Sequence, residues 1–287
     1  MIGSLLIHTN TSLAAMSDFN PYPPSQGLPD ARPSGAHGPY DPAPASEPSA
    51  DGSFAEHEPR TVAEASPAAR ARFIERTYLH LAGAIVAFVV LLSIAINLPG
   101  IERLVMAMIE SPASWGLVLV LFFGASWLAD HWARSDRSRG AQYAGLALYT
   151  VAEVITFIPL VYIARLMVGT TPIFMVGAAT LAIFAALTAY VFITRKDFSF
   201  MRGVLVVLSI GALGLVVGSL VFGFNLGLVF SVGMCVLAAG YILYHTSNVL
   251  HHYRTDQHVA ASMALLSALA LLFWYALRIL LELASSD

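Results

Sequence analysis

The sequence contains few charged residues, one cysteine and one lysine. Charged side chains make up 11% of the residues, whereas a typical soluble domain has about 25%. The single cysteine, Cys235, excludes a disulfide framework and a cysteine metal cluster. Lys196 lies between two long apolar runs, so no span carries the lysine that holds retinal in a rhodopsin. A formal net charge of -3 offers no electrostatic basis for binding nucleic acid.

Motifs of common enzyme classes are missing as well. The sequence has no phosphate-binding P-loop, no HExxH zinc motif and no GxSxG nucleophile motif. Ser219 follows a glycine but lacks the surroundings of a rhomboid-type protease nucleophile. We therefore expect a protein that is not an enzyme and that has no cofactor; an enzyme acting on a soluble substrate is a minor alternative.

Long apolar runs dominate what is present. Hydrophobic residues make up 57% of the chain, and the mean hydropathy is +0.70. Because a helix rises about 1.5 Å per residue and a bilayer core is about 30 Å thick, a run of about 20 residues crosses a membrane. The stretch 203–253 has no Asp, Glu, Lys or Arg and is long enough for two spans. The sequence predicts an all-α membrane protein with seven transmembrane helices, over residues 78–98, 113–130, 141–164, 172–194, 204–222, 226–250 and 259–281.

The first 68 residues have a different composition. Much of this segment is dense in Pro, Gly, Ser, Ala and acidic residues, which cannot bury enough apolar surface to offset the chain entropy. We predict a disordered cytoplasmic tail over residues 1–68 and a seven-span membrane domain over residues 69–287. Residues 1–16 resemble a weak signal peptide without a basic start, and translation beginning at Met16 is the alternative.

Positive charges fall mainly in alternate loops, which predicts the orientation. One set of loops and the segment before the first span carry Arg70, Arg72, Arg76, Arg134, Arg137, Arg139, Arg195, Lys196, Arg202 and Arg254. The opposite loops carry only Arg103 and Arg165. We predict a cytoplasmic N-terminus and, after seven spans, a C-terminus on the outside. The preference for arginine over lysine is typical of GC-rich bacterial genomes, so the predicted location is a bacterial inner membrane.

Two ionisable side chains fall well inside predicted spans, where such groups usually face the bundle interior and often serve function. Glu153 lies near the middle of the third span, and His245 lies one or two turns from the cytoplasmic end of the sixth. Because imidazole titrates near neutral pH, we predict a titrating pair for proton or cation passage, provided that the two helices face each other. The alternative is that each is a neutral, hydrogen-bonded group that only ties helices together.

Further polar residues gather at the ends of the spans. Asp197, His251 and His252 are candidate functional residues at the cytoplasmic rim. These histidines and His258 have no recognised metal-ligand spacing, so no metal site is predicted. For Asp130 and Asp197, a solvated or headgroup-facing position is the default expectation.

Residue spacing on two helices predicts specific contacts. Arg278 and Glu282 are four residues apart and are expected to pair or to reach toward the membrane surface. Gly211, Gly214 and Gly218 are three and four residues apart, and small residues at this spacing let helices approach closely. We expect this packing within one protomer, with a dimer interface as the alternative.

Three segments resemble the Bax inhibitor family of seven-span membrane proteins. They are residues 73–84 at the start of the first span, 194–200 in the fourth-to-fifth loop and 240–248 at the end of the sixth span. The segments occur in order on a seven-span frame, and the similarity covers about residues 70–285. The resemblance implies a compact bundle with the seventh helix central, ringed by the other six.

The resemblance also implies a cation leak, most often for calcium, that is gated by pH. In bacterial members the gate is a pair of aspartates, one in the sixth span and one in the seventh, which share a proton when closed. Here the sixth-span position is His245 and the seventh-span position falls at about Ala270. The pair is absent, and calcium prefers several oxygen ligands, so this departure argues against a calcium leak through that gate.

Two functions follow as hypotheses. The first is a pH-sensitive cation leak, for calcium or protons, or a stress-protective membrane protein. The second is a non-conducting protein that binds and modulates another membrane protein, such as a membrane protease, because family members are linked to that role. The expected partners are the lipid bilayer, cations and another membrane protein.

Overall fold

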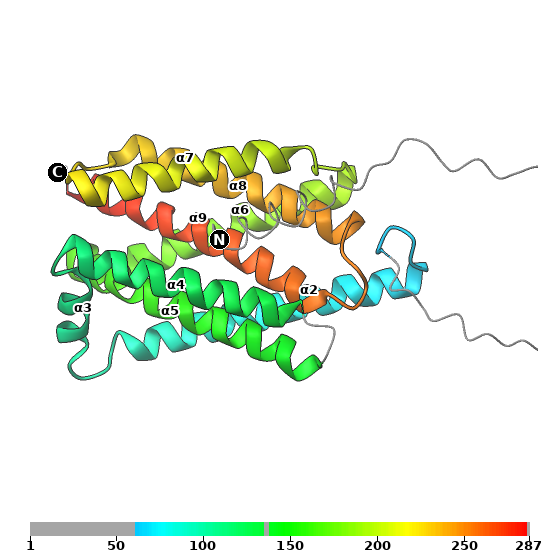
Figure 1. The fold of residues 1–287 in the computed structure, drawn as a ribbon, viewed down its shortest axis with the longest axis horizontal. Coiled ribbons are helices and arrows are strands. Elements are labelled where there is room, and N and C mark those ends of the chain that lie inside the picture. Colours follow the sequence, from blue (N-terminus) through cyan, green and yellow to red (C-terminus); the bar gives the residue numbers. More distant parts are fainter. Residues whose placement is uncertain (1–60, 135–137, 286–287) are drawn as a thin grey trace, which may run out of the picture.

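The structure is a computed structural model that describes residues 61–134 and 138–285. Over these residues it has eight helices and one isolated bridge, between Thr61 and Arg254 (Figure 1). Seven of the helices are long and apolar enough to cross a membrane, which confirms the seven predicted spans. The helices are α2 (Pro67–Ala95), α3 (Ile101–Ile109), α4 (Pro112–Ala133), α5 (Arg139–Val168), α6 (Thr170–Thr194), α7 (Met201–Phe222), α8 (Gly227–His251) and α9 (His258–Ala284).

Several helices extend beyond the apolar segments that predicted them. Helix α2 begins at Pro67, well before the predicted span, because the Ser66 hydroxyl caps it by accepting from the amide of Ala69 at 3.3 Å. The hydropathy pattern detects only the apolar part of such a helix and misses its polar first turns. The short helix α3, which follows a left-handed Gly100 with φ of 83°, was also not predicted.

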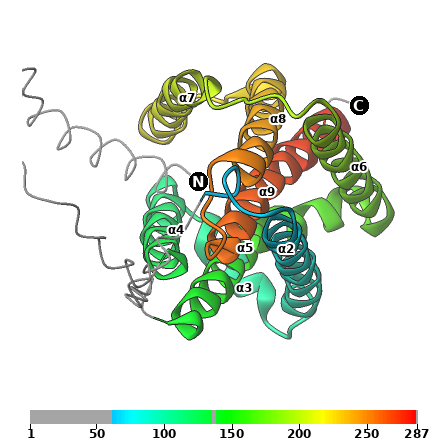
Figure 2. The ribbon, with the colours of Figure 1, turned by 90° about the vertical axis from the view of Figure 1, so that its right-hand side faces the viewer.

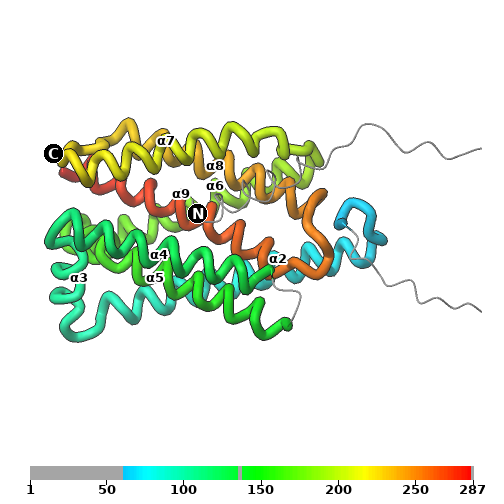
Figure 3. The backbone as a smooth tube through the Cα atoms, in the orientation of Figure 1, coloured from blue at the N-terminus to red at the C-terminus, as the bar shows by residue number. Residues whose placement is uncertain are grey.

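The segment before α2 is folded against the end of α8. Val62 is fully buried, and its amide donates to the carbonyl of Tyr253 at 2.9 Å. The Arg70 guanidinium donates to the carbonyls of Val62 and Ala63 at 3.0 Å and 2.7 Å. Residues 61–68 therefore belong to the folded part, although the composition assigned them to the tail (Figure 3). The predicted disorder of residues 1–60 lies outside the described residues.

Helix α9 lies at the centre of the bundle, as the seventh span was predicted to do. It packs against α2, α4, α5, α6 and α8, while α7 lies at the periphery next to α8 (Figure 2). Small residues on α9 make this possible: Ala260, Ala261, Ser262 and Ala268 are almost completely buried. Because short side chains let neighbouring backbones approach, α9 can be surrounded on most sides.

The close glycine contact is not the one that the sequence suggested. A Cβ atom at Gly211 or Gly214 would meet no atom of the described chain within 4 Å, so the expected packing within the protomer is wrong for these two glycines; at Gly218 it would meet only the ring of Phe224, at 3.6 Å. At Gly145 of α5, in contrast, a Cβ would lie 2.6 Å from the carbonyl oxygen of Ala129 in α4. Gly145 is therefore where the α4 and α5 backbones meet.

Candidate functional site

A cavity of about 360 Å³ lies inside the bundle between α4, α5, α7, α8 and α9. Its wall is mostly apolar and rich in aromatic side chains: Trp115, Phe122, Phe123, Phe157 and Trp274. The polar residues that line it are Glu153, Thr156, Ser209, Ser219, Ser267, Tyr275 and Arg278. A cavity of this size and composition suits a few water molecules or a small ligand beside one acidic group.

Glu153 is the acidic group of this cavity. Its side chain is on α5, only 6% of the residue is exposed, and one carboxylate oxygen accepts from the Tyr149 hydroxyl at 2.5 Å. Tyr149 is one helical turn earlier, so both side chains lie on the same face of α5. Ser267 of the central helix α9 lies beside the Tyr149 hydroxyl. The carboxyl is thus buried, hydrogen-bonded and in contact with a cavity, and its role in proton or cation passage stays a prediction.

The cavity runs from the depth of Glu153 toward the end of the bundle where α9 finishes. Arg278 lines the cavity at that end and donates to Glu282 at 3.2 Å, which confirms the predicted pairing of these two residues. Ser231 of α8 also donates to Glu282, at 3.1 Å. The arginine charge at this end is therefore balanced by a carboxylate.

His245 occupies a different part of the bundle. Its ring stacks on Tyr241, with ring centroids 5.6 Å apart, and it does not line the cavity that contains Glu153. Glu153 lies 14 residues after the first residue of α5, or about 21 Å along the helix. His245 lies 6 residues before the last residue of α8, or about 9 Å from that end. Both helix ends lie at the same end of the bundle, and Glu153 is farther from this end along its helix than His245 is along its own (Figure 1). Their coupling stays a prediction.

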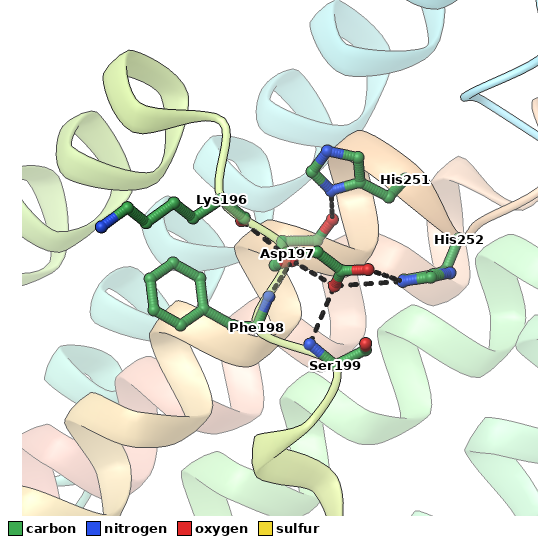
Figure 4. A network of polar contacts seen from close by, with 7 residues as sticks. Lys196, Asp197, Phe198, Ser199, His251 and His252 are labelled. Atoms are coloured by element: carbon green, nitrogen blue, oxygen red, sulfur yellow. Dashed lines mark hydrogen bonds and ion pairs between the residues drawn. The ribbon is translucent and has the colours of Figure 1, made fainter.

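The rim residues form a network that holds the α6–α7 loop against the end of α8 (Figure 4). The carboxylate of Asp197 accepts from the amide of Ser199 at 2.8 Å and from Nε2 of His252 at 3.1 Å. The Ser247 hydroxyl donates to Asp197 at 3.3 Å and accepts from the amide of Phe198 at 2.9 Å. Asp197 and His252 are therefore brought together from positions 55 residues apart.

His251 takes a separate role. It donates from Nδ1 to the Ser247 carbonyl of its own helix at 3.0 Å.

Burial raises the pKa of the Asp197 carboxyl, but hydrogen bonds from Ser199 and His252 outweigh this effect and lower the pKa from 3.8 to about 2. Asp197 is therefore a permanently charged acceptor near neutral pH.

The substitution Asp197→Asn is expected to lower the free energy of unfolding by less than about 1 kcal/mol near neutral pH, because the side chain is 45% exposed and water screens its contacts. A lowered pKa means that the carboxylate contributes fully above pH 3.8 and loses its contribution as pH falls through about 2. Thermal unfolding of the purified protein near pH 7 and near pH 5 measures the effect. A variant at least as stable as the wild type at both values would contradict the network.

Asp130 differs from the expectation of a solvated residue. It is 5% exposed, and both of its carboxylate oxygens accept from Nε of Arg134 at 3.0 Å. Arg134 also lies in electrostatic contact with Tyr253, which is buried under the segment that contains Val62. A charged pair next to a polar loop looks solvated in sequence, and the close packing of α4 against α5 beside Ala129 and Ala133 is visible only in the structure.

Metal ligands do not gather in the part of the chain that the structure describes. No group of three or more His, Cys, Asp or Glu side chains there is arranged to hold a metal ion. Tyr149 was not predicted as a site residue. Its spacing of four residues from Glu153 on one helix is the signal that identifies it.

Comparisons with known proteins agree with the resemblance to the Bax inhibitor family. The model of the family described as "Inhibitor of apoptosis-promoting Bax1" matches residues 70–286. "Bax inhibitor 1" of Schizosaccharomyces pombe is 33% identical over 113 residues, which is 38% of this chain and 41% of that protein. An uncharacterized protein of Pseudomonas aeruginosa is 40% identical over 75 residues, 26% of this chain and 34% of that protein. The matched segments cover less than half the length of each relative.

Proposed function

Because the chain belongs to the Bax inhibitor-1 family of integral membrane proteins, we propose that it is a pH-sensitive cation leak in which Glu153 is the titrating group. The observation that carries the proposal is the buried carboxyl of Glu153 at the wall of a cavity of about 360 Å³. An ionisable group at this depth is costly in hydrocarbon and is retained where ions or protons pass.

The position of the cavity supports this role. Ala270, where the resemblance places the aspartate of the seventh span, lines the same cavity as Glu153. The methyl side chain of Ala270 leaves space that an aspartate would fill. In our proposal, Glu153 of α5 supplies the carboxyl that other members supply from the central helix.

The surroundings of Glu153 favour protons or monovalent cations over calcium. Calcium takes six to eight oxygen ligands, about half of them typically carboxylates in strong sites. The cavity offers one carboxylate together with hydroxyls of residues such as Thr156 and Ser267. In our proposal, a few ordered water molecules beside this single acid and these hydroxyls carry the proton through an otherwise apolar cavity.

We propose that the protein lies in a bacterial inner membrane, with the N-terminal ends of α5 and α9 on the cytoplasmic side. The arginine-rich loops lie at this end of the bundle, and positively charged loops are retained on the cytoplasmic side. In this orientation Arg278 is near the outer surface and Glu153 lies toward the middle of the membrane. The cavity then gives an outer approach to the acid.

Flux through reconstituted protein tests the proposal. Liposomes that contain the full chain and a pH-sensitive or cation-sensitive dye should show flux above empty vesicles, and the flux should change between about pH 5 and about pH 8. Separate assays with protons, potassium and calcium identify the ion. Flux equal to that of empty vesicles for all three ions throughout this range would rule out the leak.

A second candidate function is the non-conducting modulator of another membrane protein. The absence of the aspartate pair favours it, because His245 and Ala270 occupy the two positions. In this case the purified protein would carry no flux. It would instead change the activity of a partner, such as a membrane protease, when the two are reconstituted together.

A further inference from the structure

A second, smaller pocket lies at the opposite end of the bundle from Arg278. It has a volume of about 170 Å³ and lies where α5 and α9 begin. Four side chains that line it matter for its chemistry: Arg76 of α2, Arg139 of α5, and Asp256 and His258 at the start of α9. Neither proposed function uses this pocket.

Positive charge exceeds negative charge in the pocket. His258 lies within electrostatic range of Arg76, Arg139, His80 and Asp256. The Asp256 carboxylate is already engaged by the Arg254 guanidinium, at 2.9 Å. Among residues 61–134 and 138–285, no carboxylate forms an ion pair with Arg76 or Arg139. Two guanidinium groups thus line a small pocket whose one carboxylate among the described residues, Asp256, pairs with Arg254, and this excess of positive charge is the pattern of an anion site.

The backbone adds to this charge. Helix α9 is 27 residues long, and its N-cap residue, Gln257, makes no side-chain hydrogen bond to the first turn. His258, Val259 and Ala260 of this turn are buried, so water has little access to their amide groups. The N-terminal amides of a long helix carry a partial positive charge and bind anions. Ser138 and Arg139 at the start of α5 line the same pocket, and the Ser138 hydroxyl caps that helix by accepting from the amide of Ala141 at 3.1 Å.

One buried nitrogen in the pocket wall also lacks a partner. Nδ1 of His258 has no hydrogen-bond partner among the described atoms, although the residue is only 6% exposed. The ring packs against His80, with centroids 5.0 Å apart, and His80 in turn stacks on Tyr143 at 5.4 Å. An unpartnered polar atom at this burial is uncommon in proteins and has room for a partner such as a water molecule, an ion or a ligand.

We propose that this pocket binds a phosphate group through Arg76, Arg139 and the start of α9. The volume of about 170 Å³ suits one phosphate or a small headgroup rather than a nucleotide. The same chemistry is offered by an anionic phospholipid and by free phosphate. The lipid is favoured, because Leu79 is 67% exposed and Tyr143 is 44% exposed beside the pocket, where acyl chains would lie.

Binding to purified full-length protein in detergent tests the proposal. The probes are phosphatidylglycerol, diacylglycerol with the same acyl chains but no phosphate, and sodium phosphate at matched ionic strength. Native mass spectrometry counts bound lipid, and thermal unfolding reports stabilisation by each probe. The variant is Arg76→Gln/Arg139→Gln. The matched control, Arg195→Gln/Lys196→Gln, also removes two charges at the same end but outside the pocket.

We expect phosphatidylglycerol to bind the wild type and the control, and the pocket variant to lose at least about tenfold in affinity. Diacylglycerol should not show this difference. If sodium phosphate stabilises the wild type and the control but not the pocket variant, and phosphatidylglycerol shows no such difference, the site takes a soluble phosphate. Equal binding by the pocket variant and the control, or no binding of either phosphate probe, would overturn the proposal. If the double variant fails to fold, Arg139→Gln alone replaces it, because Arg139 is exposed at the first residue of α5.

Discussion

The substitution Glu153→Gln should lower cation flux at least about tenfold and remove its dependence on pH. Glutamine keeps the size of the side chain and can still accept from Tyr149, but it can neither ionise nor exchange a proton. Loss of one favourable interaction of about 1.4 kcal/mol between the carboxylate and a passing cation corresponds to tenfold in rate or affinity. Flux into proteoliposomes from about pH 5 to about pH 8, at equal protein content, measures the effect.

The control for this experiment is Glu75→Gln. Glu75 is an exposed carboxylate on α2 and does not line the cavity, so its loss should leave flux unchanged. His245→Ala tests the second predicted group separately. Because His245 does not line the cavity that contains Glu153, we expect its replacement to leave the effect of Glu153→Gln intact. If flux through the Glu153→Gln variant keeps the wild-type dependence on pH, Glu153 is not the titrating group of the pathway.

The substitution Gly145→Ala should destabilise the protein by about 1–3 kcal/mol or more. The added methyl group would lie 2.6 Å from the Ala129 carbonyl oxygen and 2.9 Å from the Ala133 amide nitrogen. Both are backbone atoms of α4, so no side chain can rotate away to make room. The helices must separate, and the burial between α4 and α5 is partly lost. Thermal or detergent-titrated unfolding measures the difference.

Gly140→Ala on the same helix is the matched control. A Cβ at Gly140 meets nothing within 4 Å among the described atoms, and alanine favours a helix over glycine by about 1 kcal/mol. This variant should be as stable as the wild type or more stable. If Gly145→Ala unfolds at the same temperature as Gly140→Ala, the two backbones are not in the contact described above.

Much of the fold could be predicted because hydropathy is a local property. The seven long helices follow from apolar length alone, and the centrality of α9 follows from the family resemblance. The prediction of Glu153 as a buried intramembrane acid needed only its position in an apolar run. Arg278 and Glu282 could be paired because four residues make one turn of a helix.

Features that depend on which face of a helix is directed at its neighbours could not be predicted from hydropathy. Gly145 and Gly211 look alike in sequence, but only Gly145 faces another backbone, because α7 lies at the edge of the bundle. Asp130 looks like a surface residue and is buried near the contact of α4 with α5. The positions of Gly145 and Asp130 along the chain did not indicate which other helix each would contact.

The amino-acid sequence by itself determined that the protein crosses a membrane, how many spans it has and that one acid lies deep inside a span. Each follows from the energy of placing a residue type in lipid. Only the tertiary structure decided that Glu153 and Ala270 share a cavity and that Arg76, Arg139 and His258 share a pocket. These neighbours come from different helices, and the rotation of each helix is set by packing against all the others.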